Sequence, residues 1–295
     1  MRKLLVLLII PAFLVSCGDD DSPSNAALNL TVSGLEDLGA TAQYEGWIIV
    51  DGAPVSTGTF TVDANGTPST TSFSVNAADA AAATKFILTI EPIPDPSPDP
   101  ADAKLIAGDF NGSTSAALST GVAPALGDFS NAAGSLFLRT PTDETNGNNG
   151  NDIYGVWFGN PGTPPTPNFT LPTLPEGWAY EGWVIGDAGP ISTGTFTDFG
   201  AVDSGNPFSG TEANAGPPVP GEDFFNAAPA GETFPLDIRG RTIVISVEPV
   251  PDNSPAPFLL KPLLVSLAAD AATAPATHTF NQNLGSIPSG TVTRQ

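Results

Sequence analysis

Apart from carboxylates, few side chains in this sequence could act as acids, bases, nucleophiles or metal ligands. The 295 residues include 31 Asp and Glu but only one His, His278, and one Cys, Cys17. A Ser-His-Asp triad would need His278, whose context ATHTF is more typical of a half-exposed strand. The residue counts exclude zinc sites built from His and Cys, and no phosphate-loop or dinucleotide motif occurs. Carboxylate pairs could hydrolyse glycosides, but no spacing selects a pair. The sequence therefore predicts a protein that is not an enzyme.

Three loops offer oxygen ligands that a calcium ion could use. They are DANG (63–66), DFNG (109–112) and DETNGNNGND (143–152). None has the spaced Asp and Asn residues with a closing Glu that a calcium-binding loop requires. Asp, Asn and Gly are also the usual residues of tight turns. The sequence predicts no cofactor, with Ca²⁺ as the weaker alternative.

The N-terminal residues predict export and lipid attachment. Arg2 and Lys3 precede a short apolar run that cannot span a bilayer but suits a signal peptide. The run ends in Leu-Val-Ser-Cys, which resembles a bacterial lipobox, so we expect residues 1–16 to be removed and Cys17 to be acylated. An ordinary signal peptide with an incidental Cys is the alternative. Acyl chains would bind the lipid bilayer, and residues 17–27 would form an acidic tether.

The formal net charge of −22 excludes a nucleic-acid-binding surface, because phosphates would be repelled and no basic patch exists. It is compatible with solubility, cation binding or a saline habitat. Together with the lipobox it predicts a lipid-anchored protein of the bacterial cell envelope, at the outer membrane or the cell surface. Its predicted partner is an envelope protein or an extracellular ligand.

One phrase occurs twice in the chain. YEGWIIVDGAPVSTGTF (44–60) returns as YEGWVIGDAGPISTGTF (180–196), and FILTIEPIPD (86–95) returns as IVISVEPVPD (243–252). The closing segments 126–139 and 284–294 also correspond loosely. The repeat covers most of the chain after Cys17 and indicates tandem duplication of one domain.

Short β-branched and aromatic runs bounded by Gly, Pro, Asn and Asp predict an all-β chain. We expect two tandem antiparallel β-sandwiches, immunoglobulin-like, after the N-terminal signal segment; one helical turn is expected within 76–84. The predicted domains are 28–140 and 152–295, the second with a loop inserted within 198–240. Residues 141–151 form either a linker or, as we favour, the loop of a hairpin that straddles the boundary.

The repeated phrase predicts a hairpin in each domain. Asp51-Gly52 is a strong turn signal, and pairing Val50 with Val55 would place Trp47 opposite Gly58. An indole over a strand glycine would then cover exposed backbone. The residues of this predicted hairpin are Tyr44, Trp47, Gly58, Tyr180, Trp183 and Gly194. The alternative is that the aromatic side chains form a platform for a ligand.

A Glu and a Lys recur at equal spacing after the hairpin. Glu91 and Lys104 are 13 residues apart, as are Glu248 and Lys261. Each Glu precedes a proline that ends a strand. We therefore predict that each pair forms an ion pair across a proline-rich loop, contributing about 0–1 kcal/mol at a surface.

The repeated phrase, followed in each copy by a strand that ends in Glu-Pro, resembles the C-terminal extracytoplasmic domain of the anti-sigma-K factor family. The resemblance implies a β-sandwich outside the cytoplasm. Members of that family also have one membrane-spanning helix and a cytoplasmic helical segment that binds zinc. This sequence shows no His/Cys cluster that could bind the zinc of such a segment. The resemblance thus implies a sensor part without a sigma-binding part.

The feature that differs between the copies is the inserted loop, which includes Glu222, Asp223, Phe224 and Phe225. A long loop with aromatic and acidic residues suits partner recognition, although it could also be merely decorative. The sequence therefore predicts a binding or sensing module. The alternatives are an adhesin or glycan-binding protein that uses exposed Trp157 and Trp178, and a purely structural envelope protein.

Overall fold

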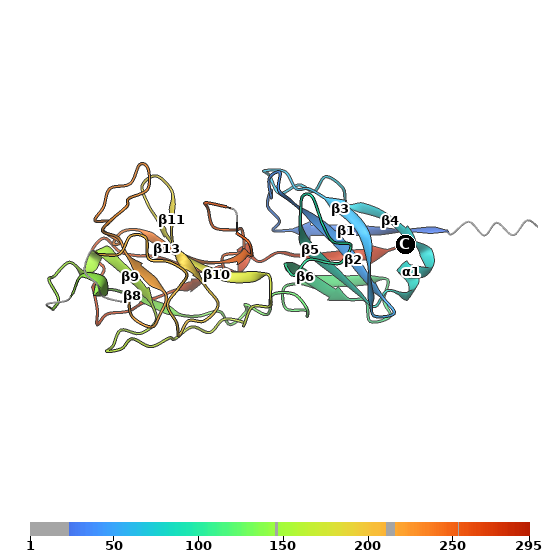
Figure 1. Cartoon of the computed structure of the whole chain (residues 1–295). Coiled ribbons are helices and arrows are strands. Elements are labelled where there is room, and N and C mark those ends of the chain that lie inside the picture. Colours follow the sequence, from blue (N-terminus) through green and yellow to red (C-terminus); the bar gives the residue numbers. More distant parts are fainter. Residues whose placement is uncertain (1–23, 145–146, 211–215, 253) are drawn as a thin grey trace, which may run out of the picture.

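The computed structural model describes residues 24–144, 147–210, 216–252 and 254–295. The predicted signal peptide and Cys17 lie outside these residues. The described chain is nearly all β, with antiparallel sheets as the sequence predicts. It forms two lobes that lie end to end (Figure 1). No helix in this described part has the length and apolar character needed to cross a membrane.

The first lobe contains one sheet, in the order β3-β2-β5-β6-β7-β17-β1-β4. Its elements are β1 (Asn25–Ser33), β2 (Ala42–Val50), β3 (Ala53–Phe60), β4 (Ser72–Asn76), α1 (Ala77–Ala82), β5 (Lys85–Pro92), β6 (Lys104–Asp109), β7 (Ser115–Ser119) and β17 (Ser289–Arg294). The two edge strands approach one another, because the rings of Phe60 and Phe73 are 5.8 Å apart. The sheet is therefore rolled around its core. The short helix α1 lies where one turn was expected, and the Asn76 side chain caps it by accepting hydrogen bonds from Ala78 N and Asp79 N.

The second lobe contains two sheets, in the orders β11-β10-β13-β14-β16 and β12-β9-β8-β15. Their strands are β8 (Ser135–Leu138), β9 (Gly155–Phe158), β10 (Trp178–Ile185), β11 (Pro190–Phe196), β12 (Gly221–Asp223), β13 (Thr242–Pro249), β14 (Leu263–Ser266), β15 (His278–Thr279) and β16 (Asn281–Gln282). Short 3-10 turns are η1 (Pro141–Asp143), η2 (Asp152–Tyr154) and η3 (Leu284–Ser286). Phe158 of one sheet packs on Phe196 of the other, with ring centroids 6.2 Å apart. The two sheets therefore form a sandwich.

The closing strands of the two sequence copies lie in opposite lobes. β8, predicted to end the first domain, pairs with β9 of the second lobe, with Leu136 opposite Phe158. β17, predicted to end the second domain, returns to the first lobe and pairs with both β1 and β7. The C-terminus accordingly lies beside β4 and α1 (Figure 1). The predicted boundaries 28–140 and 152–295 therefore differ from the observed strand pairing, because each closing segment finds its hydrogen-bonding edge in the other lobe. The pairing of β8 with β9 is the hairpin favoured for the segment around 141–151.

The repeated hairpin forms in both lobes, but in a different register from the predicted one. Val50 pairs with Ala53, so the turn has only two residues, Asp51 and Gly52, at φ values of 50° and 83°. Trp47 consequently pairs with Ser56 and not with Gly58. The predicted cover of Gly58 by the indole is wrong.

Gly58 and Gly194 have another role. In each hairpin the register shifts by one residue beside the Gly46–Gly58 or Gly182–Gly194 pair, which marks a β-bulge. Gly58 has φ +116° and Gly194 has φ +118°, a backbone conformation that favours glycine. Both copies of the repeat thus have the backbone geometry of a bulge.

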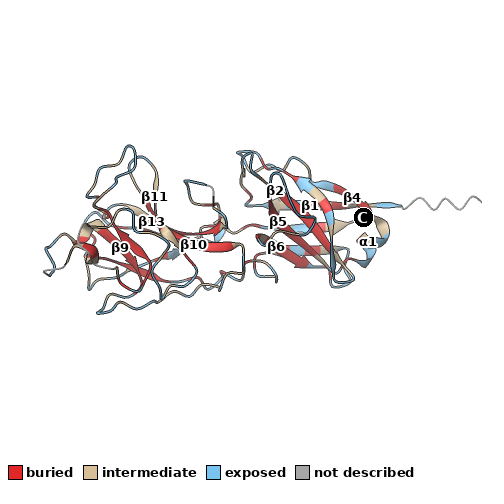
Figure 2. Cartoon of the chain, in the orientation of Figure 1, coloured by how far each residue is buried: buried red, intermediate tan, exposed pale blue. Residues whose placement is uncertain are grey.

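Buried residues lie along the strands of both lobes (Figure 2). The largest cluster of buried apolar residues is continuous across the two lobes. It includes Leu126 and Phe129 from the segment between β7 and β8. The lobes therefore share part of their apolar core.

Candidate functional site

A chain of hydrogen bonds from a tryptophan to a glutamate occurs at the same place in each lobe. In the first lobe, Trp47 Nε1 donates to Thr89 Oγ1 at 2.9 Å, and the Thr89 hydroxyl donates to Glu91. In the second lobe, Trp183 Nε1 donates to Ser246 Oγ at 2.8 Å, and the Ser246 hydroxyl donates to Glu248. Both glutamates are 1% exposed. This chain fixes each carboxylate at the end of its strand.

Each of these glutamates holds the loop that follows it, but not through the predicted ion pair. Glu91 Oε1 accepts the Ala101 N–H at 2.9 Å, and Lys104 Nζ donates to the Ala101 carbonyl oxygen at 3.0 Å. Glu248 Oε1 accepts the Phe258 N–H at 2.9 Å, and Lys261 Nζ donates to the Phe258 carbonyl oxygen.

In each lobe, the Glu therefore accepts the N–H and the Lys donates to the carbonyl oxygen of the same loop residue. Among the described residues, the ion pairs do not link Glu91 to Lys104 or Glu248 to Lys261. The 13-residue spacing was a real structural signal, but the loop backbone stands between the two charges.

A second glutamate in each hairpin supports the bulge. The Ser56 hydroxyl donates to Glu45 and accepts the Gly58 N–H at 3.2 Å. The Ser192 hydroxyl donates to Glu181 and accepts the Gly194 N–H at 3.0 Å.

The tyrosines of the repeat secure the segment before each hairpin. Tyr44 Oη donates to the Glu36 carbonyl at 3.1 Å, and Tyr180 Oη donates to the Pro172 carbonyl at 2.6 Å. Both tyrosines are at most 1% exposed. Tyr44, Trp47, Tyr180 and Trp183 thus form part of the packed hairpins, as the structural interpretation of the repeat predicts.

The strand ends and loops that these networks hold form the walls of a cleft between the lobes. Its volume is about 670 Å³. Three carboxylates line it from each lobe: Glu36, Asp37 and Asp102 from the first, and Glu176, Glu248 and Asp252 from the second. Within the described part of the chain, no Lys or Arg lines the cleft. The two Glu-Pro loops, found by the repeat, therefore meet at one acidic site.

Burial controls the electrostatics of this cleft. Burial raises the pKa of Glu248 to about 7, although hydrogen bonds from Ser246 and the Phe258 N–H oppose the shift. Burial also raises the pKa of Glu36, against the effect of Lys261. Lys261 is not one of the lining residues, and burial lowers its pKa while Glu36 and Glu248 raise it. The cleft thus combines buried carboxyl groups with exposed ones.

The tryptophans do not offer a platform for a glycan. Trp47, Trp157 and Trp178 are each 3% exposed and Trp183 is 2% exposed. Stacking on a sugar needs an accessible ring face. The glycan-binding alternative therefore has no exposed tryptophan to rely on.

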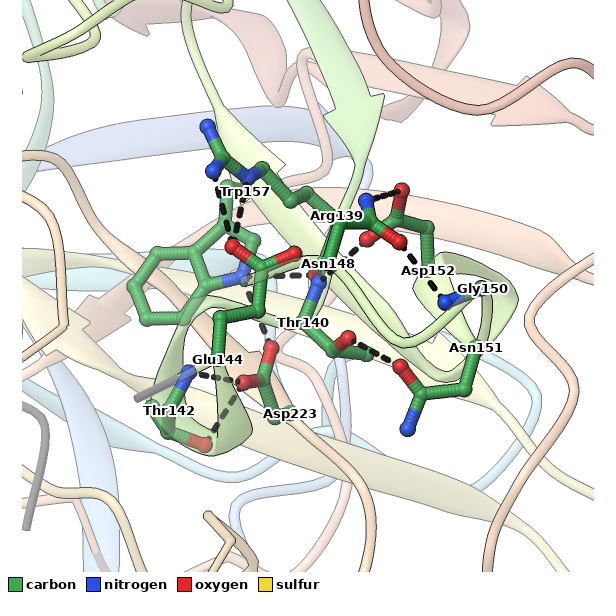
Figure 3. A network of polar contacts seen from close by, with 10 residues as sticks. All are labelled: Arg139, Thr140, Thr142, Glu144, Asn148, Gly150, Asn151, Asp152, Trp157 and Asp223. Atoms are coloured by element: carbon green, nitrogen blue, oxygen red, sulfur yellow. Dashed lines mark hydrogen bonds and ion pairs between the residues drawn. The ribbon is translucent and has the colours of Figure 1, made fainter. Parts of the chain in front are cut away.

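The predicted partner loop is part of the core. Glu222, Asp223 and Phe224 are 0% exposed, and β12 pairs with β9. Figure 3 shows that Asp223 lies between Trp157 and Thr142. Asp223 Oδ1 accepts the Trp157 indole N–H at 2.9 Å, and Oδ2 accepts the Thr142 N–H at 2.8 Å.

Phe225 is half-buried and packs edge-on against Tyr154. The insertion thus contributes the buried strand β12, which the hydrogen bonds of Asp223 hold in place. The sequence pattern of acidic and aromatic residues did not distinguish this buried strand from an exposed loop.

In each of the three proposed calcium loops, an aspartate carboxylate contacts a neighbouring group of the protein. Asp63 Oδ1 accepts the N–H groups of Asn65 and Thr67, each at 2.9 Å. Asp109 pairs with Lys85 at 2.6 Å. Asp143 Oδ2 accepts from the Asn151 side chain at 2.6 Å, in a loop of which residues 145–146 lie outside the described residues. The Asp63 contacts are those of a tight turn.

His278 lies half-exposed on strand β15, and its Nε2 is 2.9 Å from the Ala272 carbonyl oxygen. This is the strand position that the sequence favoured for it.

A different acidic group comes together within the second lobe. Oxygen atoms of Glu181, Glu248 and Asp252 all lie within 4.8 Å of one another. The sequence pattern marked Glu248 as one half of an ion pair and did not connect it with the other two. The signal was present, because Glu45, Glu91 and Asp95 recur at the corresponding positions of the first copy.

Comparison with known families gives one match. Residues 20–104 match the model described as anti-sigma-K factor rskA, C-terminal. The match covers the first copy of the repeated hairpin and the Glu91 loop, which carry the resemblance noted in the sequence. Neither curated proteins nor solved structures gave a match.

Proposed function

We propose that the protein is a lipid-anchored binding or sensing module of the bacterial cell envelope that is not an enzyme, and that the cleft between its lobes binds a positively charged segment of a partner. The anti-sigma-factor-like region at residues 20–104 supports an extracytoplasmic sensor role. The acidic cleft is the observation that carries the binding proposal.

The chemistry of the cleft favours a cationic, partly apolar ligand. Six carboxylates line it without a basic residue among the described residues. Val250, one of its lining residues, is an apolar side chain that is 53% exposed. A Lys- or Arg-bearing segment with apolar side chains would neutralise the acids and cover Val250.

A defined amphipathic Lys/Leu peptide tests this proposal in a titration against the full chain. The variant Asp102→Lys/Glu176→Lys changes one exposed carboxylate on each side of the cleft. We expect it to weaken binding by at least about tenfold, because attraction between exposed charges becomes repulsion. Binding by the unchanged protein should also weaken with salt.

The matched control is Asp198→Lys/Asp270→Lys, which alters the net charge equally at two exposed residues outside the cleft lining. Equal weakening by both double variants would show non-specific attraction to an acidic surface and would reject the cleft as the site. Absence of peptide binding by the unchanged protein would favour the purely structural alternative.

Membrane attachment through Cys17 is tested separately by labelling cells with a radioactive fatty acid. We expect label on the protein and its loss in the Cys17→Ala variant, because acylation requires the thiol. Label that persists in this variant, or an unlabelled protein in the soluble fraction, would contradict the proposed anchor.

A further inference from the structure

Three carboxylates of the second lobe converge at one point. Glu181 lies on β10, Glu248 at the end of β13, and Asp252 in the following loop. One oxygen from each lies within 4.8 Å of the others. Two ligands on opposite sides of a calcium ion are about 4.8 Å apart, because each Ca–O distance is about 2.4 Å. The three oxygens are therefore close enough to bind one ion.

Glu181 provides an independent sign that a ligand belongs here. Its side chain is 4% exposed, and its Oε2 is buried without a hydrogen-bond partner among the described residues. The other oxygen, Oε1, accepts from Ser192. Burial is the largest cause that raises the pKa of the Glu181 carboxyl group. The neighbouring carboxylates of Glu248 and Asp252 raise it further. A buried oxygen without a donor is costly unless a proton or a cation binds to it.

The neighbouring carboxylates keep free coordination positions. Glu248 Oε1 accepts from the Ser246 hydroxyl, and both of its carboxylate oxygens accept the Phe258 N–H. Each carboxylate oxygen has about two lone pairs, so Oε2 keeps one for a further ligand. Asp252 accepts the Ser254 N–H through Oδ1, at 2.8 Å. Its other oxygen, Oδ2, does not take part in that bond and can bind a cation. Because Glu248 and Asp252 also line the cleft, the group opens to solvent on that side.

We propose that Glu181, Glu248 and Asp252 bind one hard divalent cation, Ca²⁺, at the wall of the cleft in the second lobe. Only carboxylate oxygens meet there, a ligand set that favours Ca²⁺ or Mg²⁺ over zinc or copper. Water entering from the cleft can complete a coordination shell of six to eight oxygens. Ca²⁺ suits the site because it tolerates an irregular arrangement, whereas Mg²⁺ requires a nearly octahedral one.

The first lobe has the same three residue types without the same group. Glu45, Glu91 and Asp95 hold the corresponding places in the sequence, and Asp95 is exposed whereas Asp252 is half-buried. Among the described residues, only the second lobe brings three such oxygens within 4.8 Å. We therefore expect one ion per chain, and the first lobe supplies matched controls.

Calorimetric titration of the chelator-treated full chain with CaCl₂ tests the site. We expect one ion per chain, with a Kd of about 10⁻⁴–10⁻³ M, the range of extracellular calcium modules. Asp252→Asn and Glu181→Gln should each weaken binding by at least about tenfold, as expected when a ligand is lost. The corresponding first-lobe variants Asp95→Asn and Glu45→Gln should leave the affinity unchanged. Circular dichroism establishes that each variant is folded.

Terbium luminescence excited through tryptophan gives a second measurement, because Trp183 is linked to Glu248 through Ser246. We expect emission that Ca²⁺ displaces and that Asp252→Asn abolishes. Failure of the unchanged protein to bind either ion would overturn the inference and leave a shared proton as the partner of Glu181. Equal loss in the first-lobe variants would also overturn it. The peptide titration is a separate measurement, so failure of the cation site leaves the proposed cleft function to be judged by its own test.

Discussion

The two lobes contain the same hairpin but use it to different extents. In both, an indole donates to a hydroxyl group, the hydroxyl donates to a buried glutamate, and the glutamate binds a loop N–H. Among the described residues, only the second lobe adds a third carboxylate, Asp252, to this arrangement. Both lobes thus share the hydrogen-bond chain, and they differ in the position of the third carboxylate.

The lobes also differ in how they are closed. The first lobe receives β17 from the end of the chain, where it separates β1 from β7. The second lobe receives β8 from the middle of the chain. The stability of the first lobe therefore depends on residues that are far away in sequence.

Truncation of the chain after Pro288 should have the largest effect. It removes β17, including Val292, which is 0% exposed. Two edges of the first sheet would lose their hydrogen bonds, so we expect loss of a large part of a domain stability of roughly 5–15 kcal/mol. Limited proteolysis should then cleave the first lobe faster than the second. An unchanged cleavage pattern would show that β17 does not hold the first lobe closed.

Removal of either buried indole should have the next largest effect. Trp47→Ala and Trp183→Ala should each lower the free energy of unfolding by about 3–5 kcal/mol, because a cavity forms and the hydroxyl beneath loses its donor. Denaturant unfolding measures the change. Phe at the same position is the control, since it keeps most of the ring volume and should cost less. A loss below about 1 kcal/mol, on the order of a single weak hydrogen bond, would contradict the packed role.

The pH dependence of stability should differ between the lobes. Burial raises the pKa of Glu181 and of Glu248 to about 7 from an ordinary value of 4.5. Between these values the folded chain binds more protons than the unfolded chain, so the free energy of unfolding falls as the pH rises from about 4.5 to about 7. The fall should be on the order of 1–3 kcal/mol for each group.

Denaturant unfolding of Glu181→Gln and Glu45→Gln across this pH range, in the presence of a chelator, checks the prediction. Glu181→Gln should reduce the fall, because its amide does not ionise. Glu45→Gln should change it less, since Glu45 is somewhat more exposed than Glu181 and the neighbouring Asp95 is open to solvent. A pH dependence that is the same in the unchanged protein and in Glu181→Gln would exclude Glu181 as its source.

The lysines of the loops should have the smallest effects. Lys104→Met should lower the free energy of unfolding by about 0–1 kcal/mol. The Lys104 side chain is partly exposed, and in the variant water can take its place as donor to the Ala101 carbonyl oxygen. Lys261→Met should cost more, because it removes the ammonium group that attracts Glu36 and Glu248 as well as the donor to the Phe258 carbonyl oxygen. Unfolding measurements on both variants provide the comparison. A larger loss in Lys104→Met would reverse the expected order.

Much of the fold could be predicted from local sequence signals. The Asp51-Gly52 turn, the short β-branched runs and the repeated phrase identified antiparallel strands and two hairpins. The register was harder, because the two-residue turn moves the partner of Trp47 from Gly58 to Ser56, and the bulge then shifts the pairing again at Gly46. A bulge depends on one positive φ value, and a strand glycine occurs equally at a sharp bend or where another backbone approaches closely.

The placement of the closing strands could not be predicted. Segments 126–139 and 284–294 carry similar patterns, and either lobe could pair with them locally. The choice depends on how the chain crosses between lobes, which is a long-range property.

In the candidate site, too, local features could be predicted from the sequence and long-range contacts could not. The Glu and Lys spacing located the loops correctly, but only three-dimensional contacts showed that Ala101 and Phe258 lie between the charges. The hypothesis of a partner-recognition loop at Asp223 and Phe224 does not fit the burial of these residues. The sequence did not indicate this burial, because buried acids are rare and the Trp157 partner of Asp223 is not visible in sequence.

Anomalous scattering from a crystal of the full chain soaked in a manganese salt tests the central comparison most directly. Mn²⁺ shares the oxygen preference of Ca²⁺ and gives a strong anomalous signal. We predict one peak, bounded by the oxygens of Glu181, Glu248 and Asp252. No peak there, or an equal peak beside Glu45, Glu91 and Asp95, would contradict the conclusion that the second lobe alone has turned the shared hairpin into a cation site.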